Sequence, residues 1–179
     1  SATYPYALAA LHQSTVQIPN LDCDSQQADM FFLHVLKIMG CTVDIFRCLK
    51  VRGPKKLLPL GKIDLNRCPD AAMTVAILAA LAKGKSTLTG LATLRLKETD
   101  RLHALAVELT KVGVKVVEKK DALIIDGNPE TLHGATIETY DDHRMAMCFG
   151  ILGTCVPGIT ILNAECVSKT YPTFWKDIQ

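Results

Sequence analysis

The sequence has few aromatic residues, almost no excess of either charge and no long hydrophobic run. Aromatic residues make up 6% of its 179 residues, and 20 Lys and Arg residues face 18 Asp and Glu residues, for a net charge of +2. This balance excludes the strongly basic surface with which many proteins bind nucleic acid. The longest apolar stretch, Val75–Ala82, is far shorter than the ~20 residues of a membrane-spanning helix. We therefore expect no nucleic-acid partner and no membrane partner.

Several common ligand-binding signatures are also missing. The seven cysteines are an odd number and no two have the spacing C-x-x-C, which argues against a disulfide framework and a structural zinc site. Neither a Walker A loop nor a G-x-G-x-x-G motif is present, so nucleotide phosphates have no standard binding loop. The sequence opens without the basic segment of a signal peptide. We expect reduced thiols and a cytoplasmic protein, or a plastid one if the parent chain carries a transit peptide.

What the sequence does have is a large apolar share in one continuous stretch of chain. Hydrophobic residues make up 49%, and 179 residues are about one domain's worth. A linker rich in Pro, Gly or Ser does not divide the chain, so we expect a single domain over residues 1–179. The sequence lacks an initiator Met and begins inside a predicted helix, which indicates a piece of a longer chain.

One unit occurs five times along the chain: an apolar helix, a short polar or glycine-containing turn, and a strand. A glycine just after an apolar helical run is the expected end of a helix, and a β-branched run after it is typical of a strand. The predicted pairs are Tyr4–Leu11 with Thr15–Ile18, Asp29–Met39 with Cys41–Phe46, Ala71–Ala82 with Ser86–Thr89, Asp100–Val112 with Val114–Glu118, and Asp142–Leu152 with Gly158–Leu162; a last helix is expected at Thr173–Asp177.

The predicted helices alternate between two kinds. The first, third and fifth are apolar on nearly every side, so we expect them to be buried on every side. The second and fourth are amphipathic, and the polar face of the fourth carries His103, Glu108 and Lys111. Further strands are expected at Asp121–Asp126 and Thr136–Glu138. We predict a mixed α/β fold of βαβαββ units, used three times, with three buried helices surrounded by mixed sheets and amphipathic helices.

Charged residues interrupt this pattern at four places, each just before or at the start of a predicted helix. Asp70 opens the third helix, either as its N-cap or as a general base that the same backbone N–H groups keep ionised. The segment Arg95–Arg101 carries charges of both signs ahead of the fourth helix. Lys97 and Arg101 lie at the positive end of that helix, where cations are unfavourable. Either this helix start is simply solvated, or an anionic ligand lies between the two cations.

The fifth helix and the final segment supply the other two places. Asp142 is expected to cap the fifth helix, and Arg144 places a cation in its first turn. A metal site at Asp141, Asp142 and His143 is disfavoured, because adjacent side chains point in different directions and a fourth ligand is not evident. Lys169 precedes the last predicted helix, and it is either a surface lysine or part of a site.

The repeat places these four segments at equivalent ends of helices that should run side by side. Helix N-termini and cations together favour a doubly anionic ligand, and two carboxylates among them supply acid–base chemistry. The predicted rim carries the cations Lys97, Arg101, Arg144 and Lys169 and the carboxylates Asp70 and Glu98.

Four motifs make the sequence similar to a known family. They are PDAAMT at Pro69–Thr74, LKETDRL at Leu96–Leu102, DHRMAM at Asp142–Met147 and SKTYP at Ser168–Pro172. In this order they resemble the 5-enolpyruvylshikimate-3-phosphate (EPSP) synthase family, essentially over the whole chain. The resemblance implies transfer of the enolpyruvyl group of phosphoenolpyruvate to the 5-hydroxyl of shikimate 3-phosphate, with release of phosphate through a tetrahedral intermediate. It also implies a glyphosate target of the shikimate pathway that needs no cofactor and no metal.

The resemblance assigns catalytic and phosphoenolpyruvate-binding residues. Asp70 matches the base that takes the proton from the 5-hydroxyl, and Glu98 matches the acid–base residue at the enolpyruvyl methylene. Lys169 matches a lysine that contacts phosphoenolpyruvate and shares in proton transfer. Arg101 and Arg144 match the pair that clamps the phosphoenolpyruvate carboxylate.

Contacts to shikimate 3-phosphate follow in the same way. Besides Asp70, Lys97 matches one of them, and Thr93 stands where family members can have an Asn. His143 falls beside the carboxylate clamp. The family has two similar domains, so the resemblance implies that this chain is the C-terminal half and that the absent N-terminal half is its partner.

Two other interpretations remain open at this point. A divergent half-enzyme could bind an anion or a partner domain without catalysis, although all the acid–base and clamp residues of this half are present. An RNA 3′-phosphate cyclase-type enzyme of similar fold is disfavoured by the near-neutral charge and by the motifs.

Overall fold

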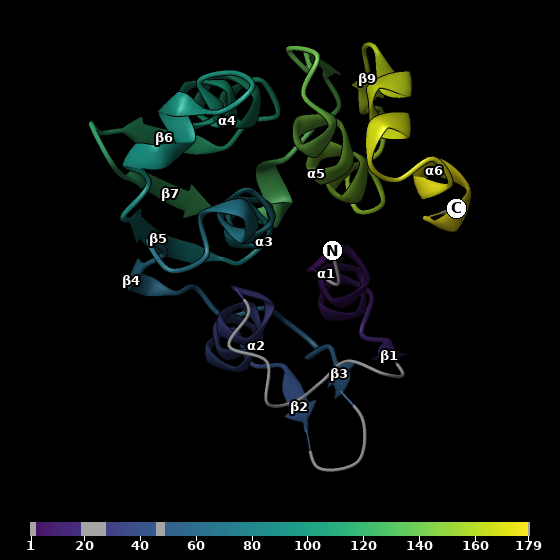
Figure 1. The fold of residues 1–179 in the computed structure, drawn as a ribbon. Helices are drawn as coiled ribbons and strands as arrows, with labels where there is room; N and C mark the ends of the chain where they lie inside the picture. Colours follow the sequence, from purple (N-terminus) through teal and green to yellow (C-terminus); the bar gives the residue numbers. More distant parts are fainter. Residues whose placement is uncertain (1–2, 19–27, 46–48, 179) are drawn as a thin grey trace.

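The computed structural model of the protein describes residues 3–18, 28–45 and 49–178. Helices and strands alternate along the chain, with short 3-10 helices, labelled η, between several of them (Figure 1). The elements are α1 (Thr3–Leu11), β1 (Thr15–Ile18), α2 (Ala28–Ile38), β2 (Thr42–Asp44), β3 (Leu49–Arg52), β4 (Gly61–Asp64), η1 (Pro69–Ala71), α3 (Ala72–Ala80), β5 (Gly84–Thr89), η2 (Ala92–Leu96), α4 (Arg101–Lys111), β6 (Lys115–Glu118), β7 (Leu123–Gly127), η3 (Pro129–Thr131), β8 (Thr136–Ile137), α5 (His143–Gly153), β9 (Thr160–Ile161), η4 (Ala164–Lys169) and α6 (Phe174–Asp177).

The predicted helices and strands are confirmed with shifts of a few residues at their ends. The end of one predicted strand, Phe46, lies outside the described residues. The structure adds two strands that the sequence reading missed, β3 and β4. In β3 the buried Leu49 and Val51 alternate with exposed basic residues, which is the period-two pattern of a half-buried strand. The segment was too short and too charged to stand out beside the helical pattern.

The strands form three sheets of mixed direction. β1, β3 and β2 make an antiparallel sheet in that order. The largest sheet has the order β4-β5-β7-β6, in which β4 and β5 are parallel and the other pairs are antiparallel. β8 and β9 form a short parallel pair. These mixed sheets agree with the predicted fold class.

The three apolar helices α1, α3 and α5 lie together between the sheets and are seen nearly end-on in Figure 1. Every residue of α3 is buried, and so is α5 from Met145 to Leu152. α3 contacts both other helices, and its Thr74 hydroxyl lies 3.6 Å from the Cys148 sulfur of α5. A helix without a polar face is stable only when neighbours cover it all round, which is the environment that α3 has.

Glycines let the ends of two of these helices approach the sheets closely. A Cβ atom on Gly127, at the end of β7, would lie 2.1 Å from the Ala79 carbonyl oxygen of α3. A Cβ atom on Gly53, just after β3, would lie 2.1 Å from the Ala9 carbonyl oxygen of α1. Any larger residue would push these helices away, so the two glycines set the depth at which the helices lie.

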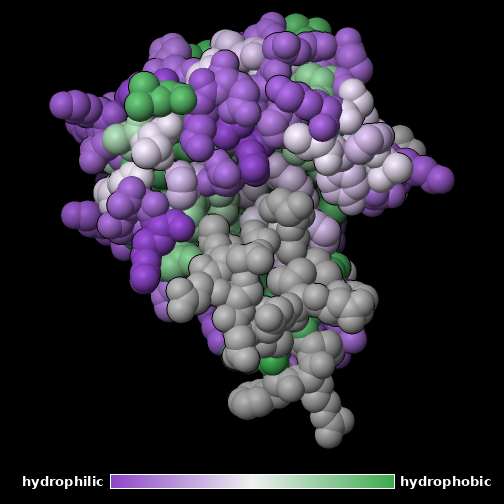
Figure 2. All heavy atoms as spheres, viewed as in Figure 1, coloured by the Kyte–Doolittle hydropathy of each residue, from purple (hydrophilic) through white to green (hydrophobic). Residues whose placement is uncertain are grey.

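The amphipathic helix α4 packs against β6 and α3, and hydrophilic residues cover most of the surface above it (Figure 2). Its predicted apolar stripe is buried. One residue predicted for its polar face is not there: Glu108 is fully buried. Its carboxylate accepts hydrogen bonds from the Tyr140 hydroxyl and the Lys111 ammonium, and these partners make burial of the charge possible. None of the helices described is long and apolar enough to cross a membrane.

Candidate functional site

The starts of α3, α4 and α5 bring six charged side chains together. We call this group the helix-start cluster, and its members are Asp70, Lys97, Glu98, Arg101, Asp142 and Arg144. All six come from the segments that the sequence pattern singled out. Asp70, Asp142 and Arg144 are held at the starts of α3 and α5, whose bodies are apolar and buried, so the backbone beneath these three is rigid. The other three lie at the start of the amphipathic α4.

Asp70 faces three cations across the cluster. Its carboxylate lies 3.6 Å from the Lys97 ammonium, 3.6 Å from the Arg101 guanidinium and 3.4 Å from that of Arg144. Of the two roles that the sequence left open for Asp70, the structure excludes that of N-cap of the third helix. A 3-10 turn begins at Pro69, so the residues at the capping positions are Cys68 for η1 and Ala71 for α3. Asp70 lies inside that turn, and its side chain is left 48% exposed.

Arg101 is buried and is surrounded by carboxylates. Its side chain is 1% exposed, and its Nε donates to Asp142 Oδ2 at 2.7 Å while Nη2 donates to Oδ1 at 3.2 Å. Glu98 lies 2.7 Å from the same Nη2. The cations at the start of α4 are therefore neutralised by carboxylates of the chain itself. Arg101 joins α4 to α5 by a bidentate pair.

Asp142 has two functions in this arrangement. Its Oδ1 accepts the Arg144 backbone N–H at 2.8 Å, so it caps α5 as predicted. The same carboxylate binds Arg101 and is itself fully buried. A buried carboxylate that satisfies both a helix end and a buried arginine fixes the relative position of two helix starts.

Arg144 is the more accessible arginine, with a side chain 22% exposed. Beside it lies Tyr4 of α1, which the sequence reading counted only as part of an apolar helix. Burial raises the pKa of the Tyr4 hydroxyl far above its ordinary value, and the guanidinium of Arg144 acts in the opposite direction. The Tyr4 ring packs edge-on against Phe174 of α6, with ring centroids 5.9 Å apart. The only signal for Tyr4 in the sequence is a hydroxyl in a mostly apolar run, and Tyr6 in the same run has one too.

His143 is buried next to the cluster. Burial lowers the pKa of its imidazole, the Asp142 carboxylate opposes this, and the cations Arg144 and Arg101 add to the lowering. The ring is therefore neutral at neutral pH. In the part of the chain that the structure describes, no three His, Cys, Asp or Glu side chains are grouped to hold a metal ion.

Two candidate residues make no direct polar contact with the helix-start cluster among the residues described. Thr93 is exposed on η2, and Lys169 is exposed at the end of η4. Among the residues described, neither makes a hydrogen bond or an ion pair with the cluster. The geometry therefore joins Asp70, Lys97, Glu98, Arg101 and Arg144 by direct contacts, and it shows no such contact for Thr93 or Lys169 among the residues described.

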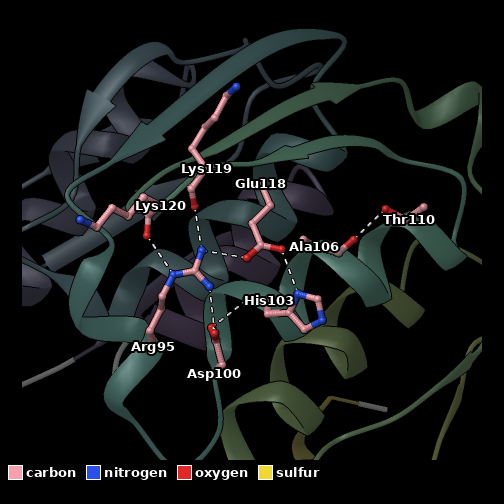
Figure 3. Close-up of polar contacts among 8 residues, drawn as sticks. All are labelled: Arg95, Asp100, His103, Ala106, Thr110, Glu118, Lys119 and Lys120. Carbon is pink, nitrogen blue, oxygen red and sulfur yellow. Dashed lines mark hydrogen bonds and ion pairs between the residues drawn. The ribbon is translucent and has the colours of Figure 1, made fainter.

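A second set of charges supports the segment that carries Lys97 and Glu98 (Figure 3). Arg95 donates to Asp100 and to Glu118, each at 2.8 Å, and to the backbone carbonyls of Lys119 and Lys120. His103 lies 2.9 Å from the other Glu118 oxygen. We call Arg95, Asp100, His103 and Glu118 the Arg95 network. The sequence showed these residues as charges near a helix start, but only the structure shows that they bind one another.

The Arg95 network is held by strong hydrogen bonds rather than by burial. Burial alone would raise the pKa of the Glu118 carboxyl, but hydrogen bonds from His103 and Arg95 outweigh it and lower that pKa. The same balance lowers the pKa of Asp100, whose Oδ1 also accepts the His103 backbone N–H and caps α4. Both groups are ionised at neutral pH, so the network fixes η2 to α4 and to the β6–β7 hairpin.

Chemically, the helix-start cluster combines two partly exposed carboxylates with cations at helix N-termini. Helix N-termini and guanidinium groups bind carboxylates and phosphates. Asp70 and Glu98 both contact Arg101, and both can exchange protons with a bound ligand. The arrangement suits a small, multiply charged anion on which proton transfer takes place.

Comparisons with known proteins agree with this chemistry. A family model described as EPSP synthase (3-phosphoshikimate 1-carboxyvinyltransferase) matches residues 1–178. A protein named 3-phosphoshikimate 1-carboxyvinyltransferase from Sulfurovum sp. (strain NBC37-1) is 44% identical over 179 residues, which are 100% of this chain and 42% of that protein. One of the same name from Escherichia coli O17:K52:H18 (strain UMN026 / ExPEC) is 42% identical over 182 residues, 99% of this chain and 41% of that protein.

Solved structures show the same relationship. An EPSP synthase from Acinetobacter baumannii matches with a TM-score of 0.84 and 29% identity, covering 98% of this chain and 43% of that chain. The enolpyruvyl transferase NikO from Streptomyces tendae matches with a TM-score of 0.71 at 20% identity, which shows a shared fold. The chain spans about two-fifths of the length of the curated relatives that it matches.

Proposed function

The chain belongs to the EPSP synthase family, and we propose that it supplies one half of the active site of a 3-phosphoshikimate 1-carboxyvinyltransferase. The reaction transfers the enolpyruvyl group of phosphoenolpyruvate to the 5-hydroxyl of shikimate 3-phosphate and releases phosphate. Because the chain spans about two-fifths of its curated relatives, its partner in this proposal is the N-terminal half of the same enzyme. Residues 1–179 then form the C-terminal domain.

One observation carries the proposal: the helix-start cluster holds the partly exposed carboxylates Asp70 and Glu98 within reach of cations from the starts of α4 and α5. Both substrates are multiply charged anions, which cations at helix N-termini are suited to bind. Asp70 lies within 3.6 Å of each of Lys97, Arg101 and Arg144. A ligand anion that enters here can replace the Asp70 contacts of these cations, and the displaced carboxylate is then next to the ligand.

The proton transfers follow from this placement. Asp70 takes the proton of the 5-hydroxyl group while the oxygen of that hydroxyl forms a bond to C2 of phosphoenolpyruvate. At the same time the methylene carbon gains a proton, which gives the tetrahedral intermediate. The intermediate then loses a methyl proton as the bond from C2 to the phosphate oxygen breaks. Glu98 handles the protons at that carbon, with Lys169 sharing in the transfer. General acid–base groups of this kind contribute about 10²–10⁴-fold to a rate.

The binding roles divide between accessible and buried cations. Arg144, which is partly exposed, contacts the phosphoenolpyruvate carboxylate directly, and Lys97 contacts shikimate 3-phosphate. Arg101 keeps its Asp142 pair and turns the remaining guanidinium edge, now near Glu98 and Asp70, toward the ligand. In this proposal Thr93, His143 and Lys169 lie at the edges of this half of the active site.

Reconstitution tests this function. We expect purified 179-residue chain to give no measurable turnover, and we expect activity when it is joined to the N-terminal half, with phosphate release following formation of the enolpyruvyl ether. In the complete enzyme, Glu98→Ala should abolish turnover, while Lys83→Ala, in an exposed ion pair, serves as the control. Near-normal turnover of the Glu98→Ala enzyme would show that the role of Glu98 is wrong. An inactive complete enzyme that still binds anions would instead favour a non-catalytic half-enzyme.

A further inference from the structure

Glu108 is a buried carboxylate that the proposed mechanism does not use. It is fully buried on α4, where it accepts hydrogen bonds from the Tyr140 hydroxyl at 2.8 Å and from the Glu138 backbone N–H at 3.2 Å. The Lys111 ammonium lies 2.8 Å away and supplies the opposite charge. Burying a carboxylate is costly unless such partners are present. Two of these partners, Glu138 and Tyr140, lie in the segment before α5, so Glu108 joins that segment to α4.

The partners of Glu108 belong to an unusual turn between β8 and α5. Tyr140 and Asp141 both have φ near +55°, a left-handed conformation that non-glycine residues seldom adopt, and here two of them are consecutive. Burial raises the pKa of Tyr140 to about 12, as does the neighbouring Glu108, so its hydroxyl stays protonated and donates. A turn of this kind persists only where surrounding contacts hold it.

Each residue of the turn is held. Glu138 accepts the backbone N–H groups of Thr139 and Tyr140, and the Thr139 hydroxyl donates to the Leu162 carbonyl. The Asn163 amide donates to Asp141. Glu108 is the contact that joins this turn to α4. The same helix carries Arg101 at its start.

The residue after the turn is Asp142, which binds Arg101 and caps α5. The segment 138–142 therefore meets α4 at two places, at Glu108 and at Arg101. The first contact fixes the backbone of the turn, and the second uses the carboxylate that the turn presents. The Asp142 carboxylate also accepts the backbone N–H of Arg144, so the position of Arg144 depends on the same turn.

We propose that the pair Glu108–Tyr140 is a positioning pair that holds the turn at 138–141 so that Asp142 aligns Arg101 and Arg144 for an anionic ligand. Its consequence for phosphoenolpyruvate rests on the proposed function, but the alignment itself does not. Loss of either side chain should free the turn to leave its left-handed conformation. Asp142 would then shift, and the two arginines would lose their common orientation.

The alignment is tested first in the full chain without substrate. Proton exchange at Arg101 Nε, followed by ¹⁵N NMR, reports whether that buried N–H stays bonded to Asp142. We expect Tyr140→Phe and Glu108→Gln to speed this exchange by at least about tenfold. Thr110→Ala is the matched control, because its hydroxyl on α4 donates to the Ala106 carbonyl of the same helix and, among the residues described, has no other partner. Exchange that is unchanged in a folded Tyr140→Phe chain would overturn the proposal.

The ligand consequence is tested in the complete enzyme. We expect Tyr140→Phe to raise the KM for phosphoenolpyruvate by about tenfold or more while kcat changes little, because the loss is one of ligand alignment. An equal fall in kcat with no change in KM would contradict a positioning role. If the wild-type complete enzyme has no synthase activity, the proposed function fails, and the exchange measurement alone then decides the positioning pair.

Discussion

Arg95 and Arg101 lie at the two ends of one charged segment, yet the structure gives them different surroundings. Arg101 is 1% exposed and bonded to a fully buried carboxylate, Asp142. Arg95 is 28% exposed and bonded to Asp100 and Glu118 near the surface. Both arginines link three segments of chain. Only the Arg101 side opens onto further charged groups, Asp70 and Arg144, that stay partly exposed.

The comparison teaches that one residue type holds the scaffold at one end of the segment and, at the other, belongs to the site that we propose for a ligand. Arg95 donates hydrogen bonds to two carboxylates and two backbone carbonyls, so its guanidinium already has partners within the chain. The helix-start cluster is open, because Asp70 alone faces three cations at 3.4–3.6 Å, longer than a good hydrogen bond. Loose contacts of this kind are replaceable by a ligand. Tight ones hold the scaffold.

The largest effect on stability is expected when the buried pair of Arg101 and Asp142 is broken. Asp142→Ala leaves Arg101 buried without its counter-charge and removes the cap of α5, so we expect the free energy of unfolding to fall by about 3–5 kcal/mol. Asp142→Asn keeps an acceptor for the cap and should cost less. Chemical denaturation measures both variants. A loss below about 1 kcal/mol for Asp142→Ala would mean that Arg101 finds other partners.

Much of this could be predicted from the sequence, and the exceptions have physical reasons. Helices and strands with strong periodicity were predicted nearly to their ends, and the charged segments were located because they break an apolar pattern. The sequence left a capping role open for Asp70, because a cap and the second residue of a 3-10 turn look alike in sequence. Glu108 was placed on a polar face because its partner, Tyr140, comes from a distant segment. Side-chain pairing across segments is set by tertiary packing, which local patterns do not contain.

A smaller effect is expected on the exposed side. Asp100→Ala removes the cap of α4 and one Arg95 contact, and we expect a loss of about 1 kcal/mol of unfolding free energy. A partly exposed ion pair adds only a few tenths to about 1 kcal/mol. Thermal unfolding of Asp100→Ala and Asp142→Ala, measured side by side, gives the ratio of their losses of unfolding free energy. Equal losses in the two variants would remove the distinction between the two arginines.

The smallest expected effect is a difference in the pH at which the helix-start cluster and the Arg95 network lose stability. Burial lowers the pKa of His143, so the unfolded chain binds a proton more readily than the folded one. Its contribution to stability is fully present above the ordinary histidine pKa of 6.5 and falls as the pH drops below that value. Asp100 and Glu118, whose pKa values are also lowered, lose theirs only below their ordinary values of 3.8 and 4.5.

His143→Gln should therefore flatten the pH dependence of the free energy of unfolding just below the ordinary histidine pKa of 6.5, and leave the steeper loss at lower pH in place. Urea denaturation at a series of pH values gives this profile. An unchanged slope in the variant would show that another group titrates there.

The central claim is that the helix-start cluster is one wall of an anion site. Titration of phosphoenolpyruvate and shikimate 3-phosphate onto the isotope-labelled chain tests it most directly. The account predicts chemical-shift changes confined to Asp70, Lys97–Arg101, Arg144 and Lys169. Another groove lies at the opposite ends of α1 and α3, lined by the lysines Lys55, Lys56 and Lys83. Changes centred on that groove, with the helix-start cluster unmoved, would contradict the account.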